Sequence, residues 1–375
     1  MNVKRAANLA TAVLFSAVVG GFFLGHVLMP DGEMTTSERR RLAQFPELSA
    51  GTLESGAFMT NFEKYSLDQF PLRDSFRSLK AVCAYNLFGQ KDNNDIYLVG
   101  DRSDGYLAKI EYPMKENQIT GAADKCNKLK EQFLAGSDVY FAMVPDKNYF
   151  LAEDNGYLRL DYDRLRTLFY DRLDPSFQVI DIFDTLTIGD YYRTDTHWDQ
   201  AKLGDTVDRI AGEMGFADRL NGDYTANTIE NFYGVYSGQS ALPGDPDTIT
   251  YLTSDVLENC TVTNLETGET AVYNLNKLTD GTSMDKYDIF LDGPAALVTI
   301  ENPAAATDRE LLLFRDSFGS SIAPLFVEAY AKVTLIDLRY LASDYLEQFV
   351  EFAGQDALFL YSTTILNTSE MLKVN

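Results

Sequence analysis

Residues 310–321 read ELLLFRDSFGSS, an apolar run followed by a polar one. Its apolar first half is typical of a buried strand, and its polar second half is typical of a tight turn into a helix. We expect a strand over 311–314 and an amphipathic helix over 322–330. Ser317 then falls at the carboxyl end of a strand, where open α/β sheets bind their ligands.

Two roles are open for Ser317 from this local sequence. As a nucleophile it would attack an acyl group, and N–H groups at the start of the following helix would favour the developing oxyanion. As a helix cap, Ser317 or Ser320 would only accept a hydrogen bond from the first helical turn.

The chain has only two histidines, and they lie in opposite surroundings. His26 is in an uncharged apolar run, whereas His197 is in Asp195-Thr196-His197-Trp198, beside the only tryptophan. Imidazole is the side chain whose unperturbed pKa lies nearest to working pH, and a carboxylate two residues away could fix its tautomer. Histidine chemistry therefore points to His197, and the alternative is a hydrogen-bonded structural histidine.

Composition excludes several classes of function. The 375 residues include 32 basic and 56 acidic side chains, and the formal charge of -24 disfavours nucleic acid and anionic membrane surfaces as partners. The cysteines Cys83, Cys126 and Cys260 are too few and too scattered for a disulfide framework or a zinc cluster, although one pair could be bridged. We expect neither a metal nor a cofactor.

The N-terminus has the pattern of a membrane anchor. Lys4 and Arg5 precede residues 6–29, which carry no formal charge. At about 1.5 Å per residue, a helix of this length covers the roughly 30 Å hydrocarbon core of a bilayer. We favour an uncleaved signal anchor over a cleaved signal peptide. The positive charges before the span place the N-terminus in the cytoplasm and the remaining chain outside the cell.

The rest of the chain divides into three parts. We predict a cytoplasmic stub and membrane anchor over 1–30, a membrane-proximal helical collar over 31–85, and an α/β domain over 86–375. A β-rich insertion is expected at about 222–302, where Tyr, Thr, Gly and Asn dominate. Strands are expected at 139–144, 178–182, 311–314, 333–337 and 357–361, and helices at 161–173, 203–214, 322–330 and 345–352. Such alternation indicates parallel strands with helical crossovers.

Five groups of motifs follow one another along the chain: Asp195-x-His197-Trp198, NFYG at 231–234, DKY at 285–287 followed by FL at 290–291, RDSFG at 315–319, and IDLRY at 336–340. In this order they resemble the motifs of the DHHW proteins of bacterial envelopes, which are similar to the SGNH-hydrolase-like domains of alginate O-acetyltransferases. The resemblance implies a flavodoxin-like three-layer α/β/α core with a parallel sheet. It also implies that Ser317 is the nucleophile, His197 the general base and Asp195 its orienting acid.

The chain departs from the family pattern at two places. Thr196 replaces the first His of the Asp-His-His-Trp motif, and only the second His, His197, matches the catalytic position. The family pattern has a Gly-Asn pair where this chain reads Asp292-Gly293-Pro294. If that Asn is an oxyanion donor, the replacement candidates are the backbone N–H groups of Ser317 and Gly293, with Arg339 as a charged option.

One further loop, Val144-Pro145-Asp146-Lys147, resembles a family loop that follows a core strand. Lys147 could hold a substrate hydroxyl or carboxylate there, and the alternative is a solvated surface lysine.

Together these features predict a membrane-anchored extracellular O-acyltransferase or esterase that acts on a cell-surface polysaccharide through an acyl-serine. The resemblance implies that acetate comes from a separate multispanning membrane acyltransferase. The alternative is an inactive polysaccharide-binding or scaffold protein, with sugar rings stacked on Tyr192, Trp198, Tyr233 and Tyr236. Each of these aromatic residues could instead belong to the core. A metal-dependent phosphoesterase is disfavoured, because one extramembrane histidine and the lack of clustered Asp-x-Asp or His-x-His spacing leave too few ligands.

Overall fold

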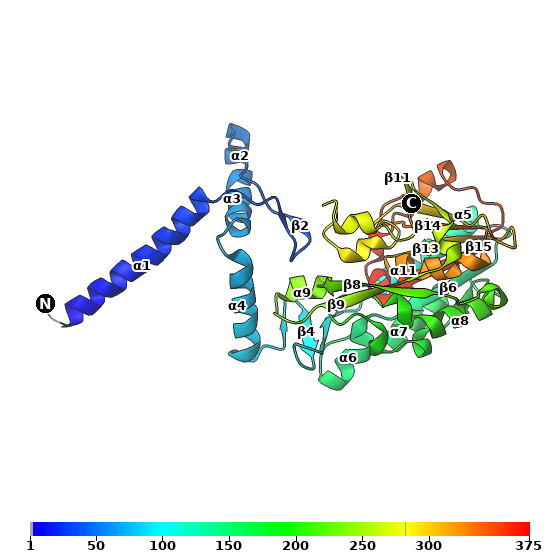
Figure 1. The fold of residues 1–375 in the computed structure, drawn as a ribbon, viewed down its shortest axis with the longest axis horizontal. Coiled ribbons are helices and arrows are strands. Elements are labelled where there is room, and N and C mark those ends of the chain that lie inside the picture. The colour runs from blue at the N-terminus through cyan, green and yellow to red at the C-terminus, as the bar shows by residue number, and fades with distance from the viewer. Residues whose placement is uncertain (1–2, 282) are drawn as a thin grey trace. The chain divides into compact units, whose positions relative to one another are not determined.

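The computed structural model describes residues 3–281 and 283–375, which form two compact units (Figure 1). The first unit comprises Met1–Asn94 and Ser237–Pro243, and the second comprises Asp95–Tyr236 and Gly244–Asn375. The chain therefore leaves the first unit, returns to it for seven residues, and leaves it again.

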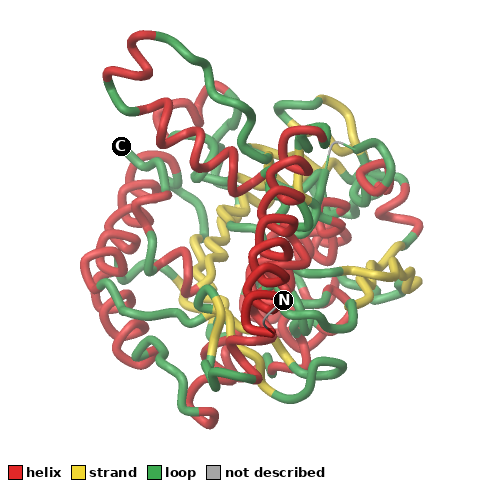
Figure 2. Tube along the Cα trace, turned by 90° about the vertical axis from the view of Figure 1, so that its left-hand side faces the viewer, coloured by secondary structure: helices red, strands yellow, loops and turns green. Residues whose placement is uncertain are grey.

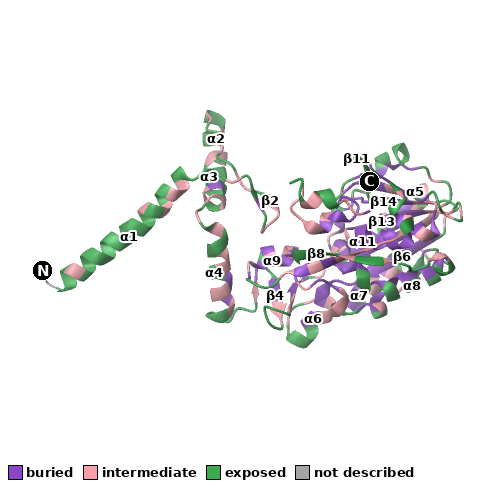
Figure 3. Ribbon diagram, in the orientation of Figure 1, coloured by how far each residue is buried: buried purple, intermediate pink, exposed green. Residues whose placement is uncertain are grey.

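The first unit is mainly helical. Its elements are α1 (Val3–Leu28), β1 (Met34–Thr35), β2 (Arg40–Arg41), α2 (Ala50–Glu54), α3 (Ala57–Asp68), α4 (Arg73–Asn86) and β3 (Asp92–Asn93). Among the described residues, α1 alone is long and apolar enough to cross a membrane, with a mean hydropathy of 1.9 and no buried residue. Figure 3 shows α1 mostly exposed, with parts of intermediate burial toward its C-terminal end. Helix α3 ends just before Phe70-Pro71, because proline cannot continue a helix.

The second unit is built on an eight-stranded sheet in the order β11-β10-β12-β14-β13-β15-β6-β7. These strands are β6 (Val139–Val144), β7 (Gln178–Ile180), β10 (Thr261–Asn264), β11 (Gly268–Thr270), β12 (Leu297–Glu301), β13 (Glu310–Arg315), β14 (Lys332–Ile336) and β15 (Asp356–Ser362). The five strands from β14 to β7 are parallel, as expected, whereas β12, β10 and β11 join antiparallel. The α/β class is confirmed, but the sheet is mixed rather than wholly parallel.

Helices cover both faces of this sheet, which gives three layers (Figure 2). Alternate residues of a strand point to opposite faces. In β6, Tyr140, Ala142 and Val144 join a core with α8 (Gly204–Glu213) and α11 (Phe318–Ile322). The other residues of β6 join a second core with α5 (Glu116–Phe133) and α7 (Tyr162–Arg172). The central strands are therefore buried on both sides (Figure 3).

The predicted β-rich insertion is only partly a separate element. Strands β8 (Thr225–Phe232) and β9 (Asp247–Thr253) form their own antiparallel pair, but β10, β11 and β12 extend the central sheet. The remaining strands and α-helices of the second unit are β4 (Ile96–Val99), β5 (Tyr106–Lys109), α6 (Lys147–Asn155), α10 (Asp255–Glu258) and α12 (Thr363–Leu366). Helix α9 (Val235–Ser240) crosses the boundary between the units.

Two predicted helices differ in the structure. The amphipathic helix expected at 322–330 is a buried 3₁₀ helix, Ala323–Ala329, which follows directly after the short helix α11. The α-helix does not continue through this segment because Pro324 has no backbone N–H to donate. The helix expected at 345–352 is a 3₁₀ helix, Ser343–Gln348. In contrast, α7 begins after the cap residue Asp161 and matches the predicted helix closely.

Candidate active site

Ser317 lies in the turn between β13 and α11, at the carboxyl end of the central parallel strands. The buried Asp316 carboxylate fixes this turn, because it accepts hydrogen bonds from the backbone N–H of Phe318 at 3.0 Å and of Ser362 at 2.8 Å. The Ser317 side chain makes no capping hydrogen bond to the helix. The interpretation of this serine as a helix cap is therefore wrong.

The side chains of Asp195, His197 and Ser317 form a continuous hydrogen-bonded chain. His197 Nε2 lies 2.7 Å from Ser317 Oγ, and His197 Nδ1 lies 2.6 Å from Asp195 Oδ1. Asp195 is fully buried and His197 is 8% exposed, whereas Ser317 is only partly buried. A buried acid, an oriented imidazole and a reachable hydroxyl are the groups that general-base activation of a serine requires.

Both oxygens of the Asp195 carboxylate have acceptor roles. Oδ1 accepts from the His197 ring and also from the His197 backbone N–H at 3.0 Å. Oδ2 accepts from the Val235 backbone N–H at 2.7 Å. The Val235 backbone reaches this position because Gly234 packs against Thr194 and Asp195, where a Cβ would lie only 2.3 Å from the Thr194 carbonyl oxygen. The carboxylate is therefore fixed in one orientation, which directs it at Nδ1.

An aromatic ring holds the imidazole from one side. Tyr287 stacks on His197 with ring centroids 3.9 Å apart and an interplanar angle of 7°. The Tyr287 hydroxyl donates to Ser321 Oγ at 2.8 Å, and burial raises the pKa of this phenol well above its ordinary value. Tyr287 therefore stays neutral and keeps the imidazole plane in line with Ser317.

The buried side chain of Lys147 binds the backbone of the loop that contains Asp195. Its Nζ donates to the carbonyl oxygens of Tyr192, Arg193 and Asp195 at 2.8, 2.9 and 3.0 Å, and the residue is 1% exposed. This geometry contradicts both expectations for Lys147, because the side chain is neither solvated nor available to substrate. A buried ammonium is tolerated where several acceptors surround it, and here they all belong to the loop that carries the triad.

The Asp247 carboxylate binds donor groups of the same loop, as Lys147 binds its carbonyl oxygens. Asp247 accepts from the Thr194 N–H and hydroxyl at 2.7 and 2.6 Å, and from Arg193 Nε at 3.1 Å. Carbonyl oxygens and an amide of residues 192–195 are therefore hydrogen-bonded to buried charged side chains, Lys147 on one side and Asp247 on the other.

We predict that Lys147→Met lowers kcat by about 10- to 100-fold with little change in KM, because a loop displaced by about 1 Å misaligns the reacting groups without removing a substrate contact. Steady-state kinetics on an activated acetyl ester measure both constants. Lys202→Met is the matched control, since Lys202 Nζ binds only the Gly189 carbonyl and the Asp199 carboxylate at an exposed position. A raised KM with unchanged kcat would instead place Lys147 in contact with substrate.

We also predict a pH-dependent stability that comes from Lys147. Burial lowers the pKa of Lys147 from its ordinary value of 10.5 to about 7, against the opposing effect of the Asp195 and Asp247 carboxylates. Between about pH 7 and 10 the unfolded chain binds more protons than the folded chain, so this contribution raises the free energy of unfolding as pH rises, by at most about 1.4 kcal/mol per pH unit. Urea unfolding at pH 7, 8 and 9 should show a smaller rise in Lys147→Met, and parallel profiles for the two proteins would contradict the prediction.

The other residues that were expected to bind an oxyanion or a substrate are already hydrogen-bonded within the protein. The Gly293 N–H donates to the Phe290 carbonyl at 3.1 Å within a turn at positive φ, so it is not directed at an oxyanion. Arg339 binds the buried Asp337 carboxylate through Nε at 2.9 Å and a terminal nitrogen at 2.6 Å. These contacts engage two of the three candidate oxyanion donors, and the Ser317 N–H stays a candidate.

The aromatic residues expected to stack on sugars divide into two groups. Trp198 is fully buried and donates to Ser321 Oγ at 2.9 Å, and Tyr192 and Tyr236 are 3% and 7% exposed. These three belong to the core, which contradicts the expectation of a sugar-binding role. Tyr233 is 53% exposed and stays a candidate.

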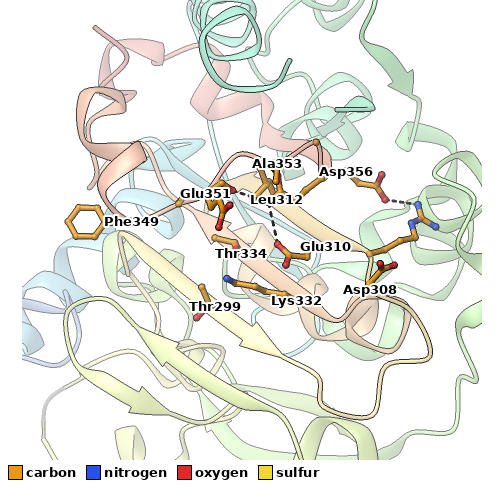
Figure 4. A pocket seen from close by; sticks show the side chains of 14 residues that line it. Thr299, Asp308, Glu310, Leu312, Lys332, Thr334, Phe349, Glu351, Ala353 and Asp356 are labelled. Atoms are coloured by element: carbon orange, nitrogen blue, oxygen red, sulfur yellow. Dashed lines mark hydrogen bonds and ion pairs between the residues drawn. The ribbon is translucent and has the colours of Figure 1, made fainter. Parts of the chain in front are cut away.

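A cavity of about 420 Å³ lies at the opposite end of the same strands (Figure 4). It is lined by Glu310, Lys332 and Asp356, which are the first residues of β13, β14 and β15. Ser317 follows the last residue of β13, so this cavity is separated from the triad by the length of the strand.

Potential metal ligands and thiols are dispersed. Within residues 3–281 and 283–375, no group of three or more His, Cys, Asp or Glu side chains could hold a metal ion. Cys83, Cys126 and Cys260 are all free thiols, so no pair of them is bridged.

Comparison with solved structures places this architecture among known folds. A DHHW family protein from Eubacterium siraeum shares 20% sequence identity at a TM-score of 0.61, over 75% of this chain and 96% of that one. The chain has the fold of a DHHW family protein. Bacillus cereus PatB1, solved with a sulfonyl adduct, matches at 19% identity and a TM-score of 0.58, over 75% of this chain and all of the other. These matches confirm the DHHW and SGNH-like resemblance as a likeness of fold.

A third structure, the O-acetyltransferase domain of Pseudomonas putida AlgJ, superposes at a TM-score of 0.39 with 13% identity, over 72% of this chain and 92% of that domain. No family model matches the sequence, and no curated protein does.

Three residues of the site were assigned no role from sequence. Tyr287 lies in the DKY motif, which indicated a family position but not a ring stacked on the histidine. Asp247 stands in a segment without any motif. Val235 contributes only its backbone N–H, and a backbone contact leaves no signal in residue type.

Proposed function

We propose that the protein is a membrane-anchored extracellular enzyme that transfers or hydrolyses O-acyl groups on a cell-surface polysaccharide through an acyl-serine intermediate. The observation that carries this proposal is the hydrogen-bonded chain from Asp195 through His197 to Ser317 Oγ. The fold shared with the DHHW family protein and PatB1 supports the same class of chemistry.

The first half of the reaction forms the acyl-serine. Ser317 Oγ attacks the ester carbonyl while its proton passes to His197 Nε2, and Asp195 stabilises the imidazolium. The Ser317 N–H is the proposed donor to the oxyanion of the tetrahedral intermediate. Collapse of this intermediate breaks the bond to the leaving alkoxide, which takes the proton back from Nε2.

The second half returns the enzyme to its starting state. A sugar hydroxyl or a water molecule attacks the acyl-serine carbonyl and gives its proton to His197, which then protonates Ser317 Oγ as that oxygen leaves. A sugar acceptor makes the protein a transferase, and water makes it an esterase. We propose a multispanning membrane acyltransferase as the source of acetate in the first case.

A sulfonyl fluoride and an activated acetyl ester together test this proposal. Activated serines form stable sulfonyl adducts, and PatB1 has been solved with such a group. We expect one adduct on the full-length protein by intact mass, mapped to Ser317 and absent from Ser317→Ala. The same preparations should release acetate from the ester, or transfer it when an oligosaccharide acceptor is added.

A catalytically inactive polysaccharide-binding protein is the second candidate function. It is favoured by the engaged N–H of Gly293, which removes one oxyanion donor, and by the exposed ring of Tyr233. Binding of a polysaccharide without sulfonylation or ester turnover would support this function instead. Loss of turnover on treatment with a chelator would point to metal-dependent chemistry.

We predict that the protein is retained in the membrane and that external protease releases its second unit from intact cells. Helix α1 is long enough to span the bilayer, and Lys4 and Arg5 before it favour a cytoplasmic N-terminus. Fractionation and immunoblotting before and after protease treatment measure both properties. Recovery of the full-length chain from the cytosol, or protection from protease, would contradict this topology.

A further inference from the structure

The turn between α3 and α4 contacts the C-terminal half of α1 within the first unit. The Phe22 ring lies 5.3 Å from the Phe70 ring and 5.5 Å from the Phe76 ring, measured between centroids. His26 of α1 lies 5.4 Å from Tyr65 in the same way. The depth of α1 in a membrane therefore determines the depth of this turn.

The length of α1 places its contact residues in the outer leaflet. The uncharged run begins after Arg5, and about 20 helical residues cross a hydrocarbon core of roughly 30 Å. An upright helix would reach the outer boundary about four residues after Phe22, which puts Phe22 roughly 6 Å below it. A tilted helix would put Phe22 deeper. The rings of Phe70 and Phe76, which touch Phe22, then lie at this boundary.

Helix α4 continues this apolar contact along one of its faces. Leu72, which precedes the helix, and Phe76, Leu79 and Leu87 recur at helical spacing and are 66%, 41%, 56% and 73% exposed. The opposite face contains Ala81, which is fully buried. The first unit therefore presents an apolar stripe that starts at the lipid-facing helix and that the described protein leaves uncovered.

Two arginines beside the stripe are paired with carboxylates. Arg73 binds Glu38 at 2.6 Å and Asp74 at 3.4 Å, and Arg77 binds Glu38 at 3.3 Å and Asp74 at 3.7 Å. Placing these two arginines against headgroups therefore does not require unpaired guanidinium groups to be dehydrated.

We propose that the stripe of Leu72, Phe76, Leu79 and Leu87 lies in the outer headgroup region of the bilayer that α1 crosses. The first unit then rests on the membrane surface as an interfacial helix does, with its apolar side buried by about 5–10 Å. The inference rests on the anchor in the proposed function. It is independent of the catalytic chemistry.

Spin labels on the full-length protein in nanodiscs test the placement. Cys83 and Cys260 are replaced by Ala, and Cys126 is buried and stays unlabelled. Labels are then introduced at Leu72→Cys and Leu79→Cys, with Asp74→Cys as the matched control on the opposite side of α4. Collision rates are measured with oxygen, which partitions into lipid, and with a water-soluble nickel chelate.

We expect the ratio of oxygen to nickel accessibility at Leu72 and Leu79 to exceed that at Asp74 by about fivefold or more. Ratios equal to that of Asp74 would overturn the proposal. Low accessibility to both reagents would also overturn it, and would indicate a protein partner or a second copy on the stripe. A label at Val13→Cys in α1 tests the membrane anchor separately. If that label is exposed to lipid while the label at Leu79 is exposed to water, the anchor stands and only the surface placement of α4 is rejected.

Discussion

Replacement of Ser317 or His197 by Ala is expected to lower kcat by roughly 10⁴- to 10⁶-fold. Without Oγ no acyl-serine can form, and without the imidazole the hydroxyl keeps its proton when it meets the carbonyl. The double variant should be no more than a few-fold worse than the more damaging single variant, because the two groups act as one unit. Steady-state turnover of an activated acetyl ester gives kcat for the two single variants and the double variant.

Ser320→Ala provides the control for this experiment. Ser320 lies three residues after Ser317, in α11, and is buried, but no hydrogen bond joins its side chain to His197 or Asp195. It should keep its kcat within a few-fold of the wild-type value. Wild-type turnover in Ser317→Ala would remove this serine from the mechanism and favour the binding protein.

Asp195→Asn is expected to lower kcat by roughly 10³- to 10⁴-fold, somewhat less than His197→Ala. Both carboxylate oxygens of Asp195 face donors, at His197 Nδ1 and at the Val235 N–H. An amide offers one oxygen and one NH₂ group, so one of the two donors must meet another donor. The variant therefore loses either the hydrogen bond that fixes the tautomer of His197 or the hydrogen bond to the Val235 N–H.

Asp199→Asn is the matched variant for this second experiment. Asp199 is a mostly buried carboxylate on the same loop, but it caps Ala201 and pairs with Lys202 rather than with the histidine. It should change kcat by less than about tenfold. Equal losses in the two variants would mean that Asp195 supports the loop and does not orient His197.

The sequence was sufficient for the parts of the fold that have strong local patterns. The apolar run of β13 followed by the polar turn at Ser317 predicted a strand tip, and Gln178 correctly marked the start of β7. The antiparallel edge of the sheet was not predicted, because the strands β10 (TVTN) and β11 (GET) are short and mostly polar and resemble an insertion as much as an extension. Pro324 was overlooked as the residue that turns α11 into a 3₁₀ helix.

The candidate site shows a similar limit. The proximity of Asp195, His197 and Ser317 followed from the resemblance and agrees with the geometry, although their roles stay predictions. Burial was harder to predict, since residue type alone does not reveal that Lys147 lies beneath the loop or that Trp198 is enclosed. Lys147 was expected either to contact substrate or to be a solvated surface lysine, and Trp198 either to stack on sugar or to belong to the core, because polar and aromatic groups next to a motif suit binding as well as support.

The return of the chain to the first unit has a mechanical consequence. Ser237–Pro243 belongs to the first unit, while Tyr236 before it and Gly244 after it belong to the second. Val235, whose N–H orients Asp195, lies only two residues before Ser237. Because a chain can extend by at most about 3.6 Å per residue, there is little slack to absorb a displacement. Tension on the first unit would therefore reach the hydrogen bond that orients Asp195. With the anchor and the serine chemistry that we propose, lateral stress in the membrane would become a force on catalysis.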